Sequence, residues 1–384
     1  MIAATANLAQ IAGAFDVIVA GGGPAGSAAA ISAARSGCSV LLVDRGIHPR
    51  NKVCGCCVAP AGIEVLAQLG SSSVLDGAQQ LSTVRLECGD RALTVRRGGG
   101  AAIGRDALDE SLLCIAAQRG CEILMGSVAS FDPDGSVIVR QGQVVRTIRS
   151  RVRIAADGLQ GTSLDGISKF DWRVSKSSRM GFGATVDSAA LDLLREQILM
   201  RVHDGGYIGA VRLANGRIDI AAAAHPQVVR AAGGVAALAA QWLGSHVRMH
   251  ALLAAAAWRG TPLLTRRRMQ IAGEDVLVAG DAGGYVEPFT GEGMSWALAT
   301  GAAAGSHASS MIDANASIQQ WPAIANRIVR SSRTRCLITA HLLRHPRVLR
   351  TAMSTAKFFP AVADRIANAF GSELVVPVRT EVAS

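Results

Sequence analysis

The chain begins with an apolar run, a glycine-rich turn, a segment of small residues and a second apolar run. Residues 15–20 are typical of a buried parallel strand, residues 24–36 of a helix and residues 39–43 of a second strand. The turn at residues 21–26 has the sequence GGGPAG and satisfies G-x-G-x-x-G between strand and helix. The order of these segments predicts a β–α–β unit, so the chain should adopt an α/β fold.

The glycines of this turn meet the backbone requirements of a dinucleotide site. Gly21 permits the tight turn, Gly23 lets the backbone approach a pyrophosphate, and Gly26 allows close packing of the helix on the strand. Pro24 and Ala25 begin the helix, whose N-terminus favours the charge of a phosphate. We therefore expect a pyrophosphate to bind at this turn.

Asp44 ends the second strand, about 20 residues after the turn, and Arg45 follows it. A carboxylate in this place can accept hydrogen bonds from the ribose of an adenosine, and we assign both residues to the cofactor site. A glycine-rich turn without a ligand is the alternative, but it gives no reason for Asp44. The turn alone does not distinguish NAD from FAD, so more distant segments decide the cofactor.

Five such segments follow at separated places in the chain. They are PRNKVCG at residues 49–55, Arg105 at the start of an expected helix over 105–119, Asp157-Gly158, Gly280-Asp281-Ala282-Gly283-Gly284 and Gly291-Glu292-Gly293. In these motifs the chain resembles the FAD-dependent oxidoreductases of the p-hydroxybenzoate-hydroxylase-like superfamily, and most closely their geranylgeranyl reductase group. The resemblance spans residues 15–305 discontinuously and implies that FAD is the cofactor.

The resemblance also implies which residues form the site. Asp281, at the carboxyl end of an expected buried strand over 275–279, can hold a ribityl hydroxyl, and the glycines around it let backbone amides approach the isoalloxazine. The remaining cofactor candidates are Lys52, Cys54, Gly55, Arg105, Asp157, Gly280, Gly291 and Gly293. The catalytic candidates are Cys54, Tyr207 and Glu292, although Glu292 could instead cap the helix that begins at Gly293.

Two departures from the family patterns bear on the substrate. The reductases line their substrate cavity with Tyr-x-Trp-x-Phe-Pro, whereas residues 207–212 here are YIGAVR, so only Tyr207 is retained. Gly209 and Val211 in place of bulky rings should open space, and Arg212 adds a charge. The Trp-x-Trp-x-Ile-Pro signature of flavin-dependent halogenases is absent, because Trp172 stands alone. Halogenation is therefore not expected.

Cys54 and Cys57 have the spacing of a CxxC pair, and Cys56 lies between them. No second pair or nearby histidine completes a zinc set, so we predict no metal site. Cys54 is the candidate for a thiol near the flavin, with small buried residues in a tight loop as the alternative. The other cysteines are expected to be packing residues, namely Cys38, Cys88, Cys114, Cys121 and Cys336.

The fold class expected is α/β, with a Rossmann-type FAD-binding domain, an inserted α+β substrate domain and a helical C-terminal region. The FAD-binding domain should comprise residues 1–172 and 259–310, the substrate domain with its mainly antiparallel sheet 173–258, and the helical region 311–384. Strands are expected at 127–140, 144–154, 180–187 and 207–224, with a further helix at 293–308.

Charge and composition constrain the partners. The formal net charge is +10, but aromatic residues make up only 4% of the chain, so nucleic acid is not expected as a partner. Arg344, Arg347 and Arg350 recur every third residue near the end, a pattern compatible with peripheral contact with an anionic membrane or with a solvated helix face. No export signal or spanning segment is evident, so we expect a cytoplasmic protein, peripheral to the inner face of a membrane if the first interpretation holds.

The function expected is oxidation–reduction on a small hydrophobic substrate. NAD(P)H or another donor would reduce the flavin transiently, and the reduced flavin would reduce a carbon–carbon double bond. A flavin monooxygenase that hydroxylates an aromatic or polyketide-like substrate is the alternative, and a non-catalytic, membrane-associated flavin-binding protein is a third. The sequence does not indicate the oligomeric state.

Overall fold

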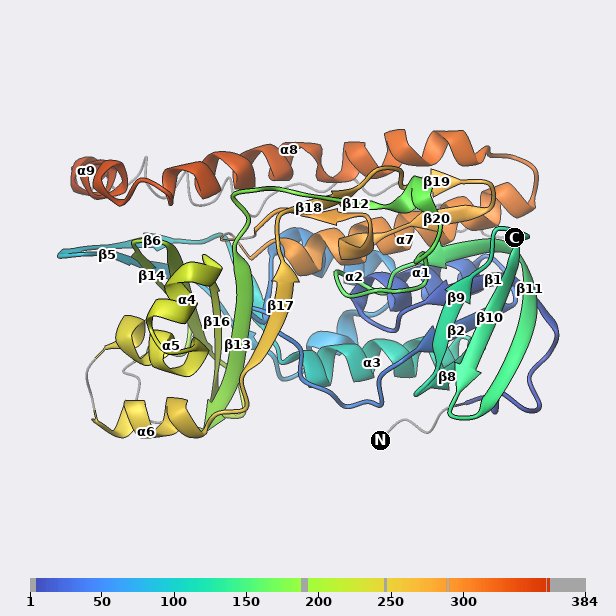
Figure 1. Ribbon diagram of the computed structural model, residues 1–384, viewed down its shortest axis with the longest axis horizontal. Coiled ribbons are helices and arrows are strands. Elements are labelled where there is room, and N and C mark those ends of the chain that lie inside the picture. Colours follow the sequence, from blue (N-terminus) through green and yellow to red (C-terminus); the bar gives the residue numbers. More distant parts are fainter. Residues whose placement is uncertain are drawn as a thin grey trace.

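The computed structural model describes residues 5–187, 193–244, 247–287, 289, 291–356 and 358–359. Two large sheets lie side by side, and a long C-terminal helix runs along one side of both (Figure 1). The expected FAD-binding and substrate regions correspond broadly to the two sheets. The expected limits at residues 173, 258 and 311 remain predictions, because sheet hydrogen bonding does not fix domain boundaries.

The first sheet contains the predicted β–α–β unit. Its strands run in the order β19-β20-β11-β1-β2-β8, with β9 and β10 extending from β11. β1 is parallel to both of its neighbours, with Val17 opposite Val152 on one side and Val40 on the other. The strands are β1 (Ala14–Ala20), β2 (Val40–Asp44), β8 (Glu122–Met125), β9 (Val128–Phe131), β10 (Ser136–Gln141), β11 (Val144–Ala155), β19 (Ala272–Gly273) and β20 (Val276–Val278).

Alternate side chains of this sheet enter two different cores, as the two-residue period of a strand requires. Val17 and Val19 pack under the helices, whereas Ile18 faces the antiparallel strands β9 and β10. The helices are α1 (Pro24–Arg35), α2 (Pro60–Gln68), α3 (Arg105–Gln118) and α7 (Gly293–Ile312). The predicted helices at 24–36, 105–119 and 293–308 are thereby confirmed within a few residues at their ends.

The strand expected over 127–140 is wrong in one respect, because the segment folds as a hairpin of β9 and β10. The turn lies at Asp132–Gly135, where Asp132 accepts the Asp134 amide and Gly135 adopts φ 92°. A similar break divides the expected strand region 207–224, at a turn ending in Gly216 with φ 83°. Short side chains that bond their own backbone, followed by glycine, produce both turns.

The second sheet has the order β17-β13-β16-β15-β14-β5-β6. All its neighbours are antiparallel except β14 and β5, which run parallel with Ile198 opposite Val84. The strands are β5 (Thr83–Cys88), β6 (Arg91–Arg96), β13 (Met180–Asp187), β14 (Gln197–His203), β15 (Gly206–Arg212), β16 (Arg217–Ala224) and β17 (Arg259–Leu263). The sheet therefore includes a hairpin from far upstream of the residues that form its other strands.

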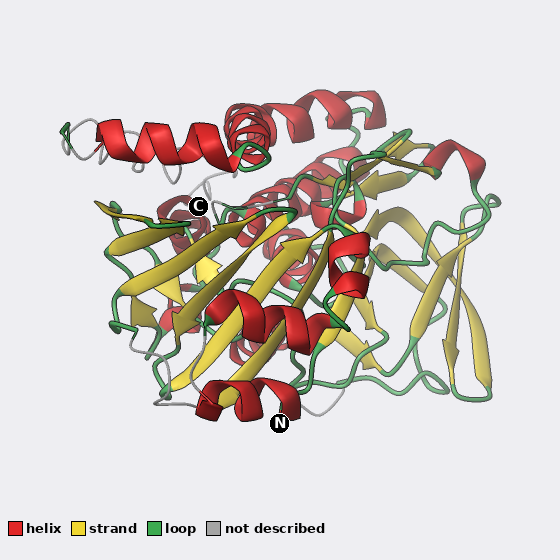
Figure 2. Ribbon diagram, turned by 60° about the vertical axis from the view of Figure 1, so that its left-hand side comes forward, coloured by secondary structure: helices red, strands yellow, loops and turns green. Residues whose placement is uncertain are grey.

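Short helices cover one face of the second sheet (Figure 2), and the side chains of its other face pack in a cluster that includes Cys57, Ala102, Leu343 and Met353. The helices are α4 (Pro226–Ala231), α5 (Val235–Leu243) and α6 (Val247–Ala255). Two small sheets join the halves, with orders β12-β18-β21 and β3-β7-β4. Their strands are β3 (Cys57–Val58), β4 (Gln79–Gln80), β7 (Ala101–Ala102), β12 (Trp172–Val174), β18 (Arg266–Arg268) and β21 (Gly284–Tyr285).

The C-terminal region is helical as far as it is described. α8 (Trp321–Leu342) lies along α7, and α9 (Pro346–Ala356) lies over the edge strands β5 and β6 (Figure 1). Residues 360–384, which the sequence also assigns to a helical region, lie outside the described residues. Among the helices that the structure describes, none combines the length and the apolar character needed to cross a bilayer.

Candidate functional site: a dinucleotide cradle open to an apolar cavity

The glycine turn connects the end of β1 to the start of α1, and its glycines have different structural roles. A Cβ on Gly21 would lie 2.5 Å from the carbonyl oxygen of Ala156, and one on Gly26 would lie 1.7 Å from that of Gly21. Among the described residues, a Cβ on Gly23 would meet within 4 Å only Arg105 Nη2, at 3.5 Å. Gly21 and Gly26 are therefore needed for packing, whereas Gly23 leaves room for a ligand above the backbone.

The N-terminus of α1 has no side-chain cap. The first amide groups of a helix lack intrahelical partners, and together with the helix dipole they favour a bound anion. Pro24 lacks an amide hydrogen. The backbone of the turn before it and of the residues after it still lies at this end of the helix. This is the position where the sequence predicts a pyrophosphate.

Asp44 lies at the end of β2 and is almost completely buried. It accepts hydrogen bonds from the Gly22 amide at 2.6 Å, the Gly46 amide at 2.6 Å and Arg50 Nη2 at 2.8 Å. Burial raises the pKa of Asp44, but the neighbouring His48 and the charge of Arg50 outweigh this and hold it well below its usual value. The carboxylate is thus ionised and retains acceptor capacity for a ribose hydroxyl.

A small polar cavity brings several predicted cofactor residues together. Its wall includes Gly21, Gly23, Asp44, Arg45, Lys52 and Asp157. Asp157 Oδ2 accepts the Ser163 amide at 2.9 Å, but the buried Oδ1 has no hydrogen-bond partner among the described residues. A buried polar atom without a partner is costly, so this oxygen fits a ligand that donates a hydrogen bond.

Three cations converge beside the glycine turn. Arg105, on α3, makes a two-point ion pair with Asp109, at 2.8 Å and 2.7 Å, and its guanidinium faces Gly23. Burial and the positive charges of Arg105 and Arg50 lower the pKa of Lys52 to about 8. Arg105 and Arg50 each pair with a carboxylate, and Lys52 adds a further buried positive charge beside them, so this cluster fits the charge of a diphosphate.

The loop after β20 carries the residues assigned to the flavin end. Gly280 adopts φ 61°, and a Cβ there would lie 2.7 Å from Ala25 Cβ, so the loop packs directly on α1. Burial raises the pKa of Asp281 to about 6, and the charge of Arg105 opposes that shift. Gly291 and Gly293 flank the start of α7, and Gly291 adopts φ 72°.

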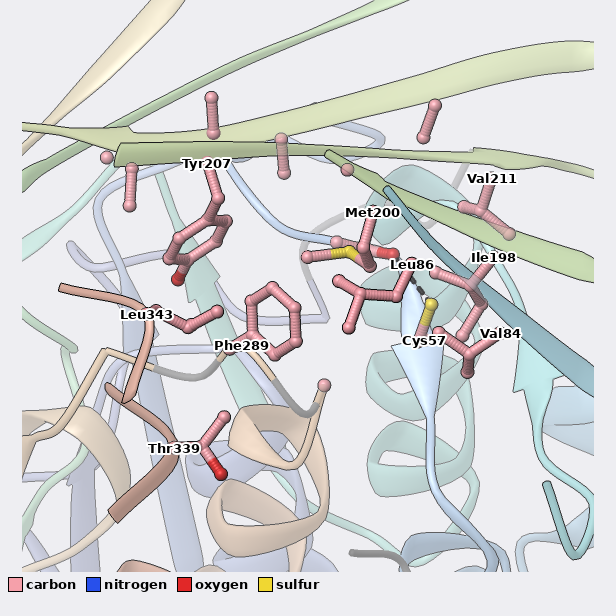
Figure 3. Close-up of a pocket in the computed structure, with 18 of the residues that line it drawn as sticks. Cys57, Val84, Leu86, Ile198, Met200, Tyr207, Val211, Phe289, Thr339 and Leu343 are labelled. Carbon is pink, nitrogen blue, oxygen red and sulfur yellow. Dashed lines mark hydrogen bonds between the residues drawn. The ribbon is translucent and has the colours of Figure 1, made fainter. Parts of the chain in front are cut away.

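A large apolar cavity of about 540 Å³ begins at this flavin end. Cys54, Gly55, Asp281 and Gly291 border it on one side, and the inner face of the second sheet borders it on the other. Figure 3 shows that the side chains which point into it are mostly apolar. Those labelled are Cys57, Val84, Leu86, Ile198, Met200, Tyr207, Val211, Phe289, Thr339 and Leu343. A volume of this size accommodates a drug-sized or lipid-like molecule.

The three predicted catalytic residues do not lie together in the structure. Tyr207 extends from β15 into the cavity, where its ring meets Phe289 edge-on at 5.1 Å between centroids (Figure 3). Burial raises the pKa of Tyr207 well above its usual value, so the phenol stays neutral. Glu292 precedes α7 and instead accepts from the Cys336 thiol at 3.4 Å and lies 3.8 Å from Arg335.

Cys54 lies where the cavity meets the predicted flavin end, half-buried in the loop before β3. A hydrogen bond with Cys56 and the charge of Arg105 lower the pKa of Cys54 to about 6, although burial opposes ionisation. Burial raises the pKa of Cys57 to about 12. All three thiols are free, and no group of His, Cys, Asp or Glu able to hold a metal ion occurs in the described part of the chain.

Two buried charged features in or next to the cavity are not part of the sequence motifs. Arg179 and Glu287 form an ion pair at 2.6 Å behind Tyr207, with both side chains 1% exposed. Asp219, on β16, stands in the cavity wall with 5% of its surface exposed. The signal for Asp219 is the acidic residue in the alternating strand RIDIAAAA, which a motif search for cofactor residues does not detect.

Comparisons with known proteins support the same cofactor. The family model "FAD dependent oxidoreductase" matches residues 16–49, the β–α–β unit with its glycine turn and Asp44. The menaquinone reductase of Mycobacterium tuberculosis H37Rv is 29% identical over 363 residues, covering 88% of this chain and 86% of that protein. The chain is an FAD-dependent oxidoreductase. Its cofactor is FAD, and the cradle of glycines, cations and Asp157 fits that group.

Two further matches extend the likeness beyond the glycine turn. The digeranylgeranylglycerophospholipid reductase 2 of Methanopyrus kandleri is 25% identical over 320 residues, covering 78% of each chain. A geranylgeranyl bacteriochlorophyll reductase-like protein of Thermoplasma acidophilum has a solved structure with a TM-score of 0.71 at 16% identity. That match covers 95% of this chain and 94% of the other, and it shows a shared fold. The α/β fold and the resemblance to geranylgeranyl reductases are confirmed.

Proposed function

We propose that this flavoenzyme reduces a carbon–carbon double bond in an isoprenoid lipid. The observation that carries the proposal is the apolar cavity of about 540 Å³ whose wall includes both Cys54 and Asp281 at the flavin end. Two relatives with high coverage are named for reductases of menaquinone and of a digeranylgeranyl phospholipid. When bound, FAD supplies hydride chemistry that no amino-acid side chain provides.

The residues of the chain would position the reactants and exclude water. Gly23, Lys52 and Arg105 would hold the diphosphate, Asp44 the adenosine ribose and Asp281 the ribityl chain. Met200, Tyr207 and Phe289 would bind an extended hydrocarbon by apolar contact. NAD(P)H or another soluble donor would reduce the flavin before the lipid is reduced.

The test is an anaerobic half-reaction on the purified holoenzyme. The flavin is reduced chemically and mixed with a menaquinone or with a digeranylgeranylglycerophospholipid in detergent, and flavin absorbance and product mass are followed. We expect reoxidation without oxygen and a lipid heavier by two hydrogens. A menaquinone that keeps these hydrogens after exposure to air has been reduced in its tail, because a ring quinol reoxidises.

If the protein is instead a monooxygenase, the opposite result is expected in this experiment. Air alone would reoxidise the flavin rapidly, and an aromatic substrate would gain one oxygen atom. That result would overturn the proposed reduction. Absence of any reaction with lipids, aromatic compounds or oxygen would favour a flavin-binding role without catalysis.

We also propose that the mouth of the cavity near α9 rests on an anionic membrane, from which a lipid would enter. Apolar side chains are exposed around it, with Ile338 64%, Val348 57% and Phe358 81% exposed, and Arg347 lies exposed on the same helix as Val348. Basic and apolar side chains on one helix are typical of interfacial helices.

Sedimentation with lipid vesicles tests this contact. We expect the protein to pellet with anionic vesicles at low salt and to be released as salt rises, because charge attraction reaches only about 10 Å at 0.1 M salt. An Arg347→Gln, Phe358→Ser double variant should pellet less, and Arg149→Gln, on the distant strand β11, serves as the control. Equal recovery in the supernatant with neutral and anionic vesicles would exclude membrane contact.

A further inference from the structure

Asp219 is a buried acid that the cofactor motifs leave without a role. It lies on β16 between Ile218 and Ile220, and 5% of its surface is exposed. Oδ1 accepts the hydroxyl of Thr185 at 3.1 Å, whereas the buried Oδ2 has no hydrogen-bond partner within the described residues. A buried carboxyl group with an unpartnered oxygen is costly and requires an explanation.

Asp219 lies in the wall that separates two cavities. One is the large apolar cavity, and the other is a smaller cavity of about 100 Å³. Val53, Cys54 and Asp219 border both. The wall of the smaller cavity is mixed, and its polar members include Asn51, Lys52, Thr185, Arg217 and Arg259. At about 30 Å³ of liquid volume per molecule, it has room for a few waters.

The groups that face Asp219 come from one loop and three strands. Cys54, Cys56 and Cys57 lie on the loop and strand across this wall, Thr185 on β13 and Arg217 on β16 itself. Burial and the negative charge of Cys54 raise the pKa of Asp219 to about 8, although hydrogen bonds with Cys56 and Thr185 and the charge of Arg217 oppose the shift. The other carboxyl group in the cavity wall, Asp281, has its pKa raised to about 6. At neutral pH, Asp219 is therefore the carboxyl group of the two that carries a proton.

We propose that Asp219 is the acid that protonates the substrate carbon, and that it regains its proton through the smaller cavity. The inference rests on the proposed reduction of a double bond. In that reaction a hydride, drawn from reduced flavin, is added to one carbon and a proton to its neighbour. The O–H bond of Asp219 breaks, and the electron pair of the double bond forms the second C–H bond. The carboxylate then takes a proton from water, so no further oxidant or reductant is needed.

Replacing Asp219 with asparagine tests the role, because asparagine has nearly the same shape but does not donate an acidic proton. We expect Asp219→Asn to bind FAD normally and to reduce the menaquinone probe at least about 100-fold more slowly, the range of general acid catalysis. In the wild type, the rate with pre-reduced flavin should fall as pH rises through about 8, where the raised pKa of Asp219 lies, and Asp219→Asn should lack this fall. Asp219→Glu should restore part of the rate and the fall.

Asp187→Asn is the matched control. Asp187 lies on the neighbouring strand β13 and pairs with the same Arg217, at 3.3 Å, but its side chain is 89% exposed. We expect this variant to keep the wild-type rate and pH profile. Cys54→Ala should move the alkaline fall to lower pH, because the loss of the thiolate charge removes one cause of the raised pKa of Asp219.

A readout that does not depend on turnover completes the test. The infrared C=O band of a protonated carboxyl group should be present at pH 7 in the holoenzyme, disappear near pH 9, and be missing from Asp219→Asn. Persistence of the same band in Asp219→Asn, or reduction of the probe by that variant at the wild-type rate and pH profile, would overturn the assignment while leaving the proposed reduction intact. A wild-type enzyme that does not reduce the double bond would overturn both.

Discussion

Replacing Gly23 with valine is expected to release FAD from a protein that still folds. The backbone at Gly23 is extended, with φ −81° and ψ −174°, a conformation that any residue adopts. The fold leaves room for a Cβ, but the branched side chain would occupy the space through which the backbone approaches the diphosphate. We expect the dissociation constant of FAD to rise at least about 100-fold, a change of about 2.8 kcal/mol.

The measurement is fluorescence titration of the apoprotein with FAD, together with circular dichroism of each variant. Gly13→Val is the control, because Gly13 also has open space around its Cβ position but lies exposed just before β1. A folded Gly23→Val protein that retains its flavin with wild-type affinity would show that the diphosphate does not lie at this turn.

Replacing Gly301 with alanine is expected to destabilise the fold, even though alanine favours helices. A Cβ at this position in α7 would lie 2.0 Å from the Ala25 carbonyl oxygen and 2.8 Å from Ala25 Cα in α1. The neighbours are backbone atoms of a buried helix, so the two helices must separate. Overpacking of this kind costs roughly 3 kcal/mol, and the higher helix propensity of alanine offsets about 1 kcal/mol. We expect a net loss of about 2 kcal/mol in the free energy of unfolding.

Chemical denaturation at saturating FAD would measure this loss. Ser306→Ala provides the comparison, because Ser306 lies on the same helix but is half-buried and outside the α1 contact at Gly301. That variant receives the helix propensity of alanine without a backbone clash. If Gly301→Ala unfolded at the same denaturant concentration as Ser306→Ala, the close contact between α1 and α7 would not contribute to stability.

The features that could be predicted from the sequence are those that depend on neighbouring residues. The turn at Gly21–Gly26 requires glycine for local backbone reasons, and Asp44 follows at a fixed distance because one helix separates two strands. The motif around Asp281 is likewise continuous in sequence. The residues proposed to hold FAD could therefore be named from the sequence and stay a prediction, whereas the ion pair of Arg105 with Asp109 became visible only in the structure.

The substrate-binding region could not be predicted in the same detail. Its residues come together only because strands far apart in the sequence pair with each other. β5 joins β14 across more than a hundred intervening positions, and no local pattern indicates that partner. Asp219 appears in the sequence as one polar residue in an alternating strand, which is typical of a solvated face. In the fold it lies buried in a wall shared with Cys54, which is distant from it in the sequence.

The parallel pairing of β14 with β5 also affects how the chain can be completed during synthesis. The second sheet needs β5, which is made early, whereas the first sheet needs β20 and α7, which are made after the second sheet has ended. The first half therefore cannot be finished until the whole second sheet has been synthesised, unlike a domain that precedes another in the chain. A nascent chain that ends before α7 lacks the helix packed on α1, and an isolated fragment beginning at β13 leaves the edge of β14 without its partner.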